Sequence, residues 1–326
     1  MLKPTFNQEQ YWFRIRQQEL VRVRTFAAPG RYPHGEIVLP DGFFHADAEA
    51  AILVTRGFSW NHYFEGSGFD EFGWPFPSET RFMGAMLLCE KQDGPVVSFY
   101  PHHEPALLLD PATVDLADPK CRTAIVELVK DVSAWPVDVR AREFYKQRAQ
   151  DTLDLFLATE LELSRLEATW AGTSLKNFVL LRGISSIVKS DMLSRHREFG
   201  AEALMSLYVA LECSFQLVLE YLREKGFAAP SASDAARWMH ETFEVHFGLD
   251  PPDPSYKYFQ EFYEDRIVTF HPRNRFGDFP LLPTYWDDVF HLRRAIPPVF
   301  SFLIHGEHSP SFLDAINEFR ARRPGA

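Results

Sequence analysis

The sequence has 326 residues, of which 46% are hydrophobic and 15% aromatic, and its formal net charge at pH 7 is −11. This composition is typical of a folded globular chain long enough for two domains, and it excludes an intrinsically disordered protein. The excess of acidic residues argues against broad nonspecific binding of nucleic acid, so any phosphate-binding site is expected to be small and local.

The three cysteines, Cys89, Cys121 and Cys213, show neither a CxxC motif nor paired spacing. A sparse, odd number of cysteines favours a reducing compartment over a disulfide framework. The first residues lack the apolar core of a secretory signal, and no run reaches the roughly 18 uninterrupted apolar residues of a membrane span. We therefore expect a soluble, cytoplasmic protein that does not bind membranes.

The N-terminal part of the chain is interrupted by Gly and Pro and contains short runs typical of β-strands. The run ELVRVRTF alternates apolar and charged residues with a period of two, as a half-buried strand does. Strands are expected at residues 19–26, 35–40, 50–58, 81–90 and 94–100, with an aromatic, Gly-rich loop at 65–80. Residues 1–137 are thus predicted to form a mixed or mainly β domain with a sensing or regulatory role.

Beyond about residue 138 the pattern changes to long segments with helical periodicity. Helices are expected at residues 139–170, 174–196, 199–226, 231–248, 255–270, 285–306 and 310–323. The helix at 199–226 is the clearest, because it ends on Lys225 and Gly226, a typical C-terminal stop. Residues 138–326 are therefore predicted to form an all-α helical bundle, which makes the whole chain an α+β protein.

Glu212 lies within the helix expected at 199–226, on the same side as Tyr208, Leu211 and Phe215 at helical spacing. A carboxylate on an apolar stripe needs a partner. Arg266 is one candidate; alternatively, Glu212 pairs with another cation or lies at the edge of the stripe.

The helix expected at 255–270 ends in the segment Arg266-Ile-Val-Thr-Phe-His271, which a proline follows. The residue before a proline is disfavoured in the helical region, so His271 is expected at or just past the last turn. Arg273 and Arg275 come directly afterwards. This gathering of cations predicts either a small anion-binding site or a helix C-terminus that is simply capped by positive charge.

An arginine followed after about four to six residues by a histidine, on the last core helix of a bundle, resembles the HEPN superfamily. The likeness rests on Arg266 and His271 and on the preceding long helix with its internal acid, Glu212, and it covers about residues 140–310. Similar spacing from Arg56 to His62 shows that the helical setting is the distinguishing feature. In that family the Arg and His of two protomers commonly meet at a dimer interface. Active members, among them toxins and antiviral effectors, cut RNA without a metal.

The resemblance implies a metal-independent endoribonuclease that acts as a homodimer on single-stranded RNA, needs no cofactor, and leaves room for a regulatory protein partner. His271 would transfer a proton, Arg266 would bind the reacting phosphate, and Glu212 would position Arg266. The candidates for substrate binding, through flanking phosphates and base stacking, are Arg273, Asn274, Arg275 and Phe270.

Two other interpretations remain open. In the first, the bundle is a non-catalytic scaffold or binding module whose arginines pair with acidic neighbours; position 267, usually polar in active members, is Ile267 here. In the second, the N-terminal domain carries the function and the bundle dimerises it. No metal site is predicted, because His102 and His103 would point to opposite faces of a strand, and His240 and His246 lack the spacing of a helix-borne zinc motif.

Overall fold

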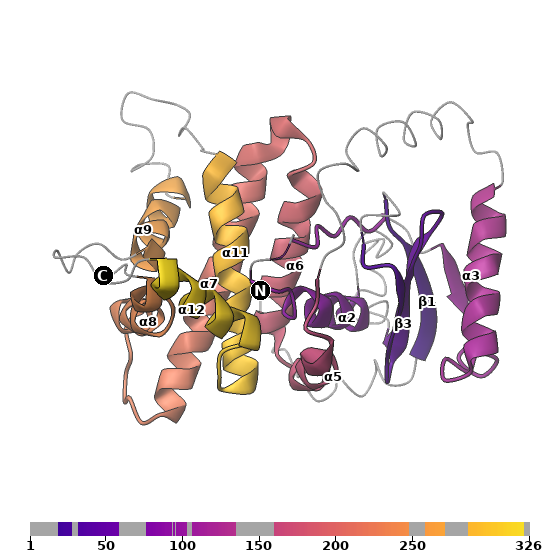
Figure 1. The fold of residues 1–326 in the computed structure, drawn as a ribbon, viewed down its shortest axis with the longest axis horizontal. Coiled ribbons are helices and arrows are strands. Elements are labelled where there is room, and N and C mark those ends of the chain that lie inside the picture. Colours follow the sequence, from indigo (N-terminus) through magenta and orange to yellow (C-terminus); the bar gives the residue numbers. More distant parts are fainter. Residues whose placement is uncertain are drawn as a thin grey trace, which may run out of the picture. The chain divides into compact units, whose positions relative to one another are not determined.

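The computed structural model describes residues 19–27, 32–58, 76–92, 94, 96–102, 106–134, 160–247, 258–270 and 286–322 (Figure 1). The chain forms two compact units, the first made of residues 1–83 and 99–159, the second of residues 84–98 and 160–326. The β-sheet lies in the first unit and most helices lie in the second, so the predicted α+β class is confirmed. The boundary expected at residue 137 falls outside the described residues, and the segment 84–98 belongs to the helical unit.

The first unit is built on a five-stranded antiparallel sheet with the strand order β2-β3-β4-β1-β5. The strands are β1 (Glu19–Thr25), β2 (Gly35–Leu39), β3 (Gly42–Ala46), β4 (Ala51–Phe58) and β5 (Leu107–Leu109). β2 and β3 form a tight hairpin, because Leu39 pairs with Gly42 across a two-residue turn. β1 pairs with β4 along its full length.

The side chains of β1 point alternately to the two faces of the sheet, as the period of two predicts. Val21 and Val23 join the apolar core that the sheet forms with α3 (Pro119–Ala134). On the other face Arg24 makes a two-pronged pair with Glu79 of α2 (Pro77–Leu87), Nε to Oε1 at 2.9 Å and Nη2 to Oε2 at 3.1 Å. Both side chains are fully buried, so each is the counter-charge that the other requires.

Three of the five expected strands are confirmed as β1, β2 and β4. The strand expected at 81–90 is wrong, since α2 covers most of that segment. A short apolar run of this kind is compatible with a buried strand or a buried helix, and the helix signal was Pro77 at the first helical position. Residues 96–100, within the strand expected at 94–100, have no regular secondary structure.

The second unit is a helical bundle around α7 (Gly200–Glu224), as Figure 1 shows. The helices in contact with α7 are α6 (Phe178–Leu193), α8 (Ala232–Met239), α9 (Tyr258–Phe270) and α11 (Trp286–His305). α5 (Leu163–Gly172) and α12 (Pro310–Arg322) complete the described part of the unit. Each of these helices overlaps a segment that the sequence predicts to be helical, and residues 139–159 of the first such segment lie outside the described chain.

α7 is the central helix of this bundle. Among the described residues it is the one helix long and apolar enough to cross a membrane, but 61% of its apolar window is buried inside the protein. That burial is compatible with the core helix of a soluble protein. α6 approaches closely at Gly183, where a Cβ atom would lie 3.2 Å from Cβ of Cys213 and 2.5 Å from the ring of Phe300 in α11.

Candidate functional site

Glu212 lies at the midpoint of α7, on a face of that helix that the described neighbours leave open. All the remaining residues from Ala203 to Leu219 are buried or half-buried, whereas 48% of the Glu212 side chain is exposed. Its neighbours at helical spacing, Tyr208 and Phe215, are buried. Glu212 therefore lies at the edge of the apolar stripe, as one of the expected alternatives has it.

Arg266, in the last turns of α9, is the cation that pairs with Glu212. Its Nη2 atom is 2.8 Å from Oε2 of Glu212, and 19% of its side chain is exposed. The guanidinium also lies over the ring of Tyr263, 4.8 Å from the centroid. Tyr263 in turn stacks on Phe215 of α7, with ring centroids 4.3 Å apart. The expected Glu212–Arg266 pair is thus present, and a stack of rings beside it holds α9 on α7.

The guanidinium of Arg266 still has unused hydrogen-bonding capacity. Its Nε–H is buried and has no hydrogen-bond partner among the described residues. A guanidinium carries five N–H donors in a planar fork, and Glu212 engages it through Nη2. A buried donor without an acceptor lowers the stability of the fold by about 1–3 kcal/mol. This arginine is therefore suited to donate a hydrogen bond to an oxygen atom of a ligand.

The remaining predicted residues follow directly in the chain. α9 is described as far as Phe270, without the side chain of that residue. The candidates beyond it lie outside the described residues: His271, Arg273, Asn274 and Arg275. Of the predicted site, the structure therefore brings together Arg266 and Glu212.

The start of α9 is anchored by a residue that the sequence did not reveal. Oε1 of Glu244 accepts a hydrogen bond of 2.7 Å from the backbone N–H of Phe259, and its Oε2 lies 2.5 Å from Nδ1 of His240. Residues 240–244 form a π-helical turn, a rare element that no sequence pattern announces here. A carboxylate at a helix N-terminus is favoured by the helix dipole. Carboxylates therefore fix both ends of the described α9, Glu244 at its start and Glu212 near its end.

Negative charge lies on another side of α9. Burial, with added repulsion from Asp288 and Glu264, raises the pKa of Asp265 above its usual range. An anionic ligand is repelled there, so the side of α9 that carries Arg266 is the one suited to it. No group of three His, Cys, Asp or Glu side chains in the described ranges could hold a metal ion.

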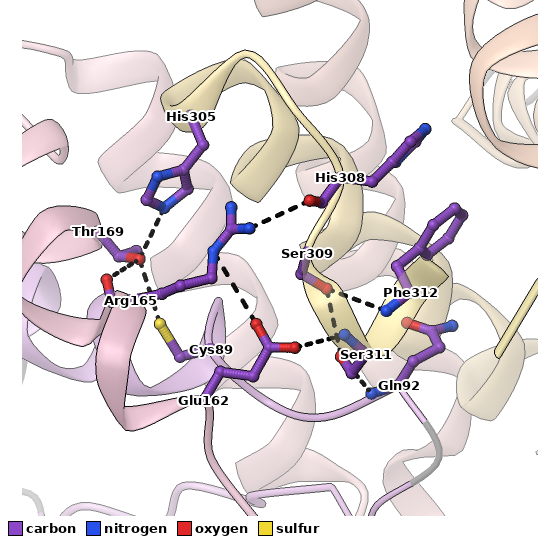
Figure 2. A network of polar contacts seen from close by, with 10 residues as sticks. All are labelled: Cys89, Gln92, Glu162, Arg165, Thr169, His305, His308, Ser309, Ser311 and Phe312. Atoms are coloured by element: carbon purple, nitrogen blue, oxygen red, sulfur yellow. Dashed lines mark hydrogen bonds and ion pairs between the residues drawn. The ribbon is translucent and has the colours of Figure 1, made fainter. Parts of the chain in front are cut away.

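A second polar cluster in the helical unit ties α5 to the start of α12 (Figure 2). Oε1 of Glu162 accepts a hydrogen bond of 2.7 Å from the backbone N–H of Ser311, and Nη1 of Arg165 donates to the carbonyl of His308 at 3.1 Å. The hydroxyl of Ser309 accepts the backbone N–H of Phe312, which caps α12. These bonds satisfy backbone groups at a helix start, which indicates a structural role.

The same cluster contains a cysteine and a histidine, the residue types of a nucleophilic site. In Figure 2 the hydroxyl of Thr169 lies between them, 3.1 Å from Sγ of Cys89 and 2.9 Å from Nε2 of His305. Burial raises the pKa of the Cys89 thiol to about 11, and the side chain is almost fully enclosed. A thiol that stays protonated and out of reach of substrate is not a nucleophile, so this arrangement serves packing.

Arg293 forms the most deeply buried charge cluster of the helical unit. Its Nε donates to Asp191 at 2.8 Å, and Nη1 and Nη2 donate to the carboxylate of Glu90 at 3.1 and 2.9 Å. The carbonyl of Val97 accepts from Nη2 at 2.8 Å. Burial raises the pKa of Glu90, although the charge of Arg293 acts against that rise. The cluster links α6 and α11 with segment 84–98, and only about a tenth or less of each charged side chain is exposed to solvent.

Comparison of the chain with known protein-family models, with curated proteins and with solved structures finds no match. Functional inference therefore rests on the geometry of the site itself.

Proposed function

We propose that the protein is a metal-independent endoribonuclease of the HEPN type, in which Arg266 and His271 act on the same phosphate. The observation that carries this proposal is the setting of Arg266. An ion pair and an aromatic ring hold its guanidinium, and its buried Nε–H lacks an acceptor among the described residues. His271 follows five residues later in the chain.

The chemistry follows from the two residue types. His271, as a neutral imidazole, takes the proton of the ribose 2′-OH, and the freed oxygen attacks the adjacent phosphorus. The bond from phosphorus to the 5′-oxygen breaks, that oxygen takes up a proton, and a 2′,3′-cyclic phosphate remains on the other fragment. Arg266 binds the negative charge that builds on the phosphate oxygens, which is the largest single contribution such a site makes. Glu212 keeps the guanidinium in place between turnovers.

The wider proposal assigns single-stranded RNA as substrate and a homodimer as the active form, in the cytoplasm. The sheet-containing unit would sense a signal or bind a regulatory protein, and the helical unit would cut. A toxin or an antiviral effector fits that division of labour. Arg273, Asn274, Arg275 and Phe270 would contact nucleotides beside the cleaved bond.

One observation favours a second candidate function, a non-catalytic scaffold or binding module. Glu212 already neutralises Arg266 at 2.8 Å, so the arginine has a structural use without any substrate. In that case the ion pair fastens α9 to α7 and does nothing else.

A cleavage assay separates the two candidates. The full chain is incubated with mixed single-stranded RNA in EDTA, alongside the variants His271→Ala and Arg266→Ala. Arg322→Ala, at an exposed cation in the last turn of α12, is the matched control. The enzyme proposal expects cleavage by the wild type and the control and a loss of at least about a hundredfold in the two site variants. Equal cleavage by all four proteins, or none by any of them, would contradict it.

A further inference from the structure

α6 shows solvent almost nothing except two cations. Of its residues 178–193, all described, only Arg182 and Lys189 are exposed; the others are buried or half-buried. Seven residues make almost two full turns, so the two side chains leave the same face of the helix, about 10 Å apart along its axis. A helix otherwise covered by its neighbours thus keeps one open line, and that line is basic.

This basic line lies beside Glu212. α6 and α7 are consecutive helices with a short connection, which makes them antiparallel neighbours, and Gly183 of α6 faces Cys213 of α7 at close range. Arg182 comes directly before Gly183, and Glu212 directly before Cys213, so each side chain points about 100° away from the contact residue that follows it. Because the two helices are antiparallel, both rotations lead to the same side of the α6–α7 interface. The Cys213 thiol responds to both charges: burial raises its pKa to about 11, Arg182 lowers it and Glu212 raises it.

Between the cations of α6 and the arginine of α9 runs an open strip of α7. The residues of this face recur at spacings of four and three, and all are half-buried or exposed: Met205, Val209, Glu212, Gln216 and Leu219. We call these five residues the α7 strip. Cys213, which faces α6, and Phe215, which meets Tyr263 of α9, lie to either side of it. The strip therefore lies between Arg182 and Lys189 on one side and Arg266 on the other. We call this partly exposed surface, made of the five strip residues and the three cations, the channel.

We propose that this channel binds the sugar–phosphate backbone of single-stranded RNA, with Arg182 and Lys189 on phosphates that lie away from the cleaved bond. The proposal rests on the proposed ribonuclease function and names how its substrate is held. The chain as a whole has a net charge of −11, so nonspecific attraction is unavailable to it and cations must be placed locally. Within the α7 strip the one acid is Glu212, and it is paired with Arg266.

The channel fits a single strand better than a duplex. The α7 strip offers apolar side chains, Met205, Val209 and Leu219, that unpaired bases can contact through their faces. In a duplex those faces are stacked inside the helix, and only the backbone charge would remain to be recognised. We therefore expect a preference for single strands at equal charge.

The test uses a short fluorescein-labelled 2′-O-methyl oligonucleotide, which has no 2′-OH and cannot be cleaved. Fluorescence anisotropy measures its binding to the full chain from about 50 to 200 mM salt, where phosphate contacts have their steepest effect. The double variant Arg182→Ala/Lys189→Ala should weaken binding about tenfold to a hundredfold through two lost charge-assisted contacts. The slope of log affinity against log salt should become shallower by about 1.4, at about 0.7 per phosphate on a single strand.

The control is Arg320→Ala/Arg322→Ala, which removes the same charge from exposed positions in the last turn of α12. It should bind within about twofold of the wild type, since it lies outside the channel. The charge-preserving variant Arg182→Lys/Lys189→Arg should keep the wild-type salt slope. Equal losses in both alanine double variants, wild-type binding by the channel variant, or no binding of the single strand at all would overturn the proposal. Equal affinity for the corresponding duplex would overturn its choice of a single strand.

The outcome is separable from that of the cleavage assay. Channel-dependent binding by a protein that never cuts RNA would leave the channel in place and remove the catalytic proposal. Cleavage that depends on His271, together with wild-type binding by the Arg182→Ala/Lys189→Ala protein, would support the catalytic proposal and remove the channel.

Discussion

The Glu212–Arg266 pair offers a sharp test, because its two candidate roles predict different effects of one substitution on RNA affinity. Glu212→Gln keeps the size and an acceptor oxygen of the side chain but removes its charge. In the enzyme account Glu212 competes with the substrate phosphate for Arg266. In the scaffold account it serves only to fasten α9 to α7.

The expected loss of stability is small in both accounts. The ion pair joins a side chain that is about one-fifth exposed to one that is about half exposed, and pairs accessible to water contribute about 0.5–1 kcal/mol. For a helical unit of this size, that loss lowers the melting temperature by about 1–4 °C. Tyr263 and Phe215, which are unchanged, continue to hold α9 in place.

The expected change in RNA affinity is a gain. Two like charges about 5 Å apart in water repel by about 0.8 kcal/mol, so removing the carboxylate should tighten binding of the 2′-O-methyl oligonucleotide about fourfold. Glu167→Gln, at an exposed acid of α5, is the matched control and should leave affinity unchanged. Unchanged or weaker binding by Glu212→Gln would refute the view that Arg266 exchanges a carboxylate for a phosphate. A fall of more than about 10 °C would refute the assignment of the pair as a weak surface interaction.

Three further predictions concern the helical unit. Gly183→Ala should lower the free energy of unfolding, measured in urea, by about 1–3 kcal/mol, because the new methyl group meets the buried ring of Phe300. A gain in stability would contradict the close approach of α6 to α11. Arg293→Met strands two buried carboxylates and should cost about 3–5 kcal/mol, with partial recovery in mild acid as they protonate; wild-type stability at neutral pH would contradict this. Burial lowers the pKa of both His305 and His308 below 6.5. As the pH falls, the two imidazoles are therefore protonated more readily in the unfolded chain than in the folded one, and the melting temperature should fall from about pH 7 to pH 5.5. The His305→Gln/His308→Gln protein should show a shallower fall, and a rise in the wild type would contradict the assignment.

Much of the helical unit could be predicted because its helices carry strong, long signals. The capping box at Ser231 marks the start of α8, and a segment of more than twenty residues with helical periodicity marks α7. The sheet unit was harder, because its elements are short. β3 and β5 have five and three residues, too few to show a period, and the apolar run at 81–90 formed a helix.

The candidate site also has parts that the sequence could indicate and parts that it could not. The Glu212–Arg266 pair was one of the alternatives that the sequence left open, since a carboxylate on an apolar helix face needs a partner, and the structure supplies Arg266 as that partner. Glu244 could not be found, because its partner Phe259 lies fifteen residues away and the contact depends on a π-helical turn. The basic line on α6 was equally invisible, since the exposure of Arg182 and Lys189 only becomes special once every neighbouring residue is known to be covered.

The central claim is that Arg266 and His271 cut RNA through its own 2′-OH, and the chemistry of the product ends tests it most directly. Mass spectrometry of fragments formed in EDTA by the wild type and by Glu167→Gln should find 2′,3′-cyclic phosphates and free 5′-OH ends. The His271→Ala protein should yield none. Fragments with 5′-phosphates and free 3′-OH ends, or cyclic phosphates formed equally by His271→Ala, would contradict the account.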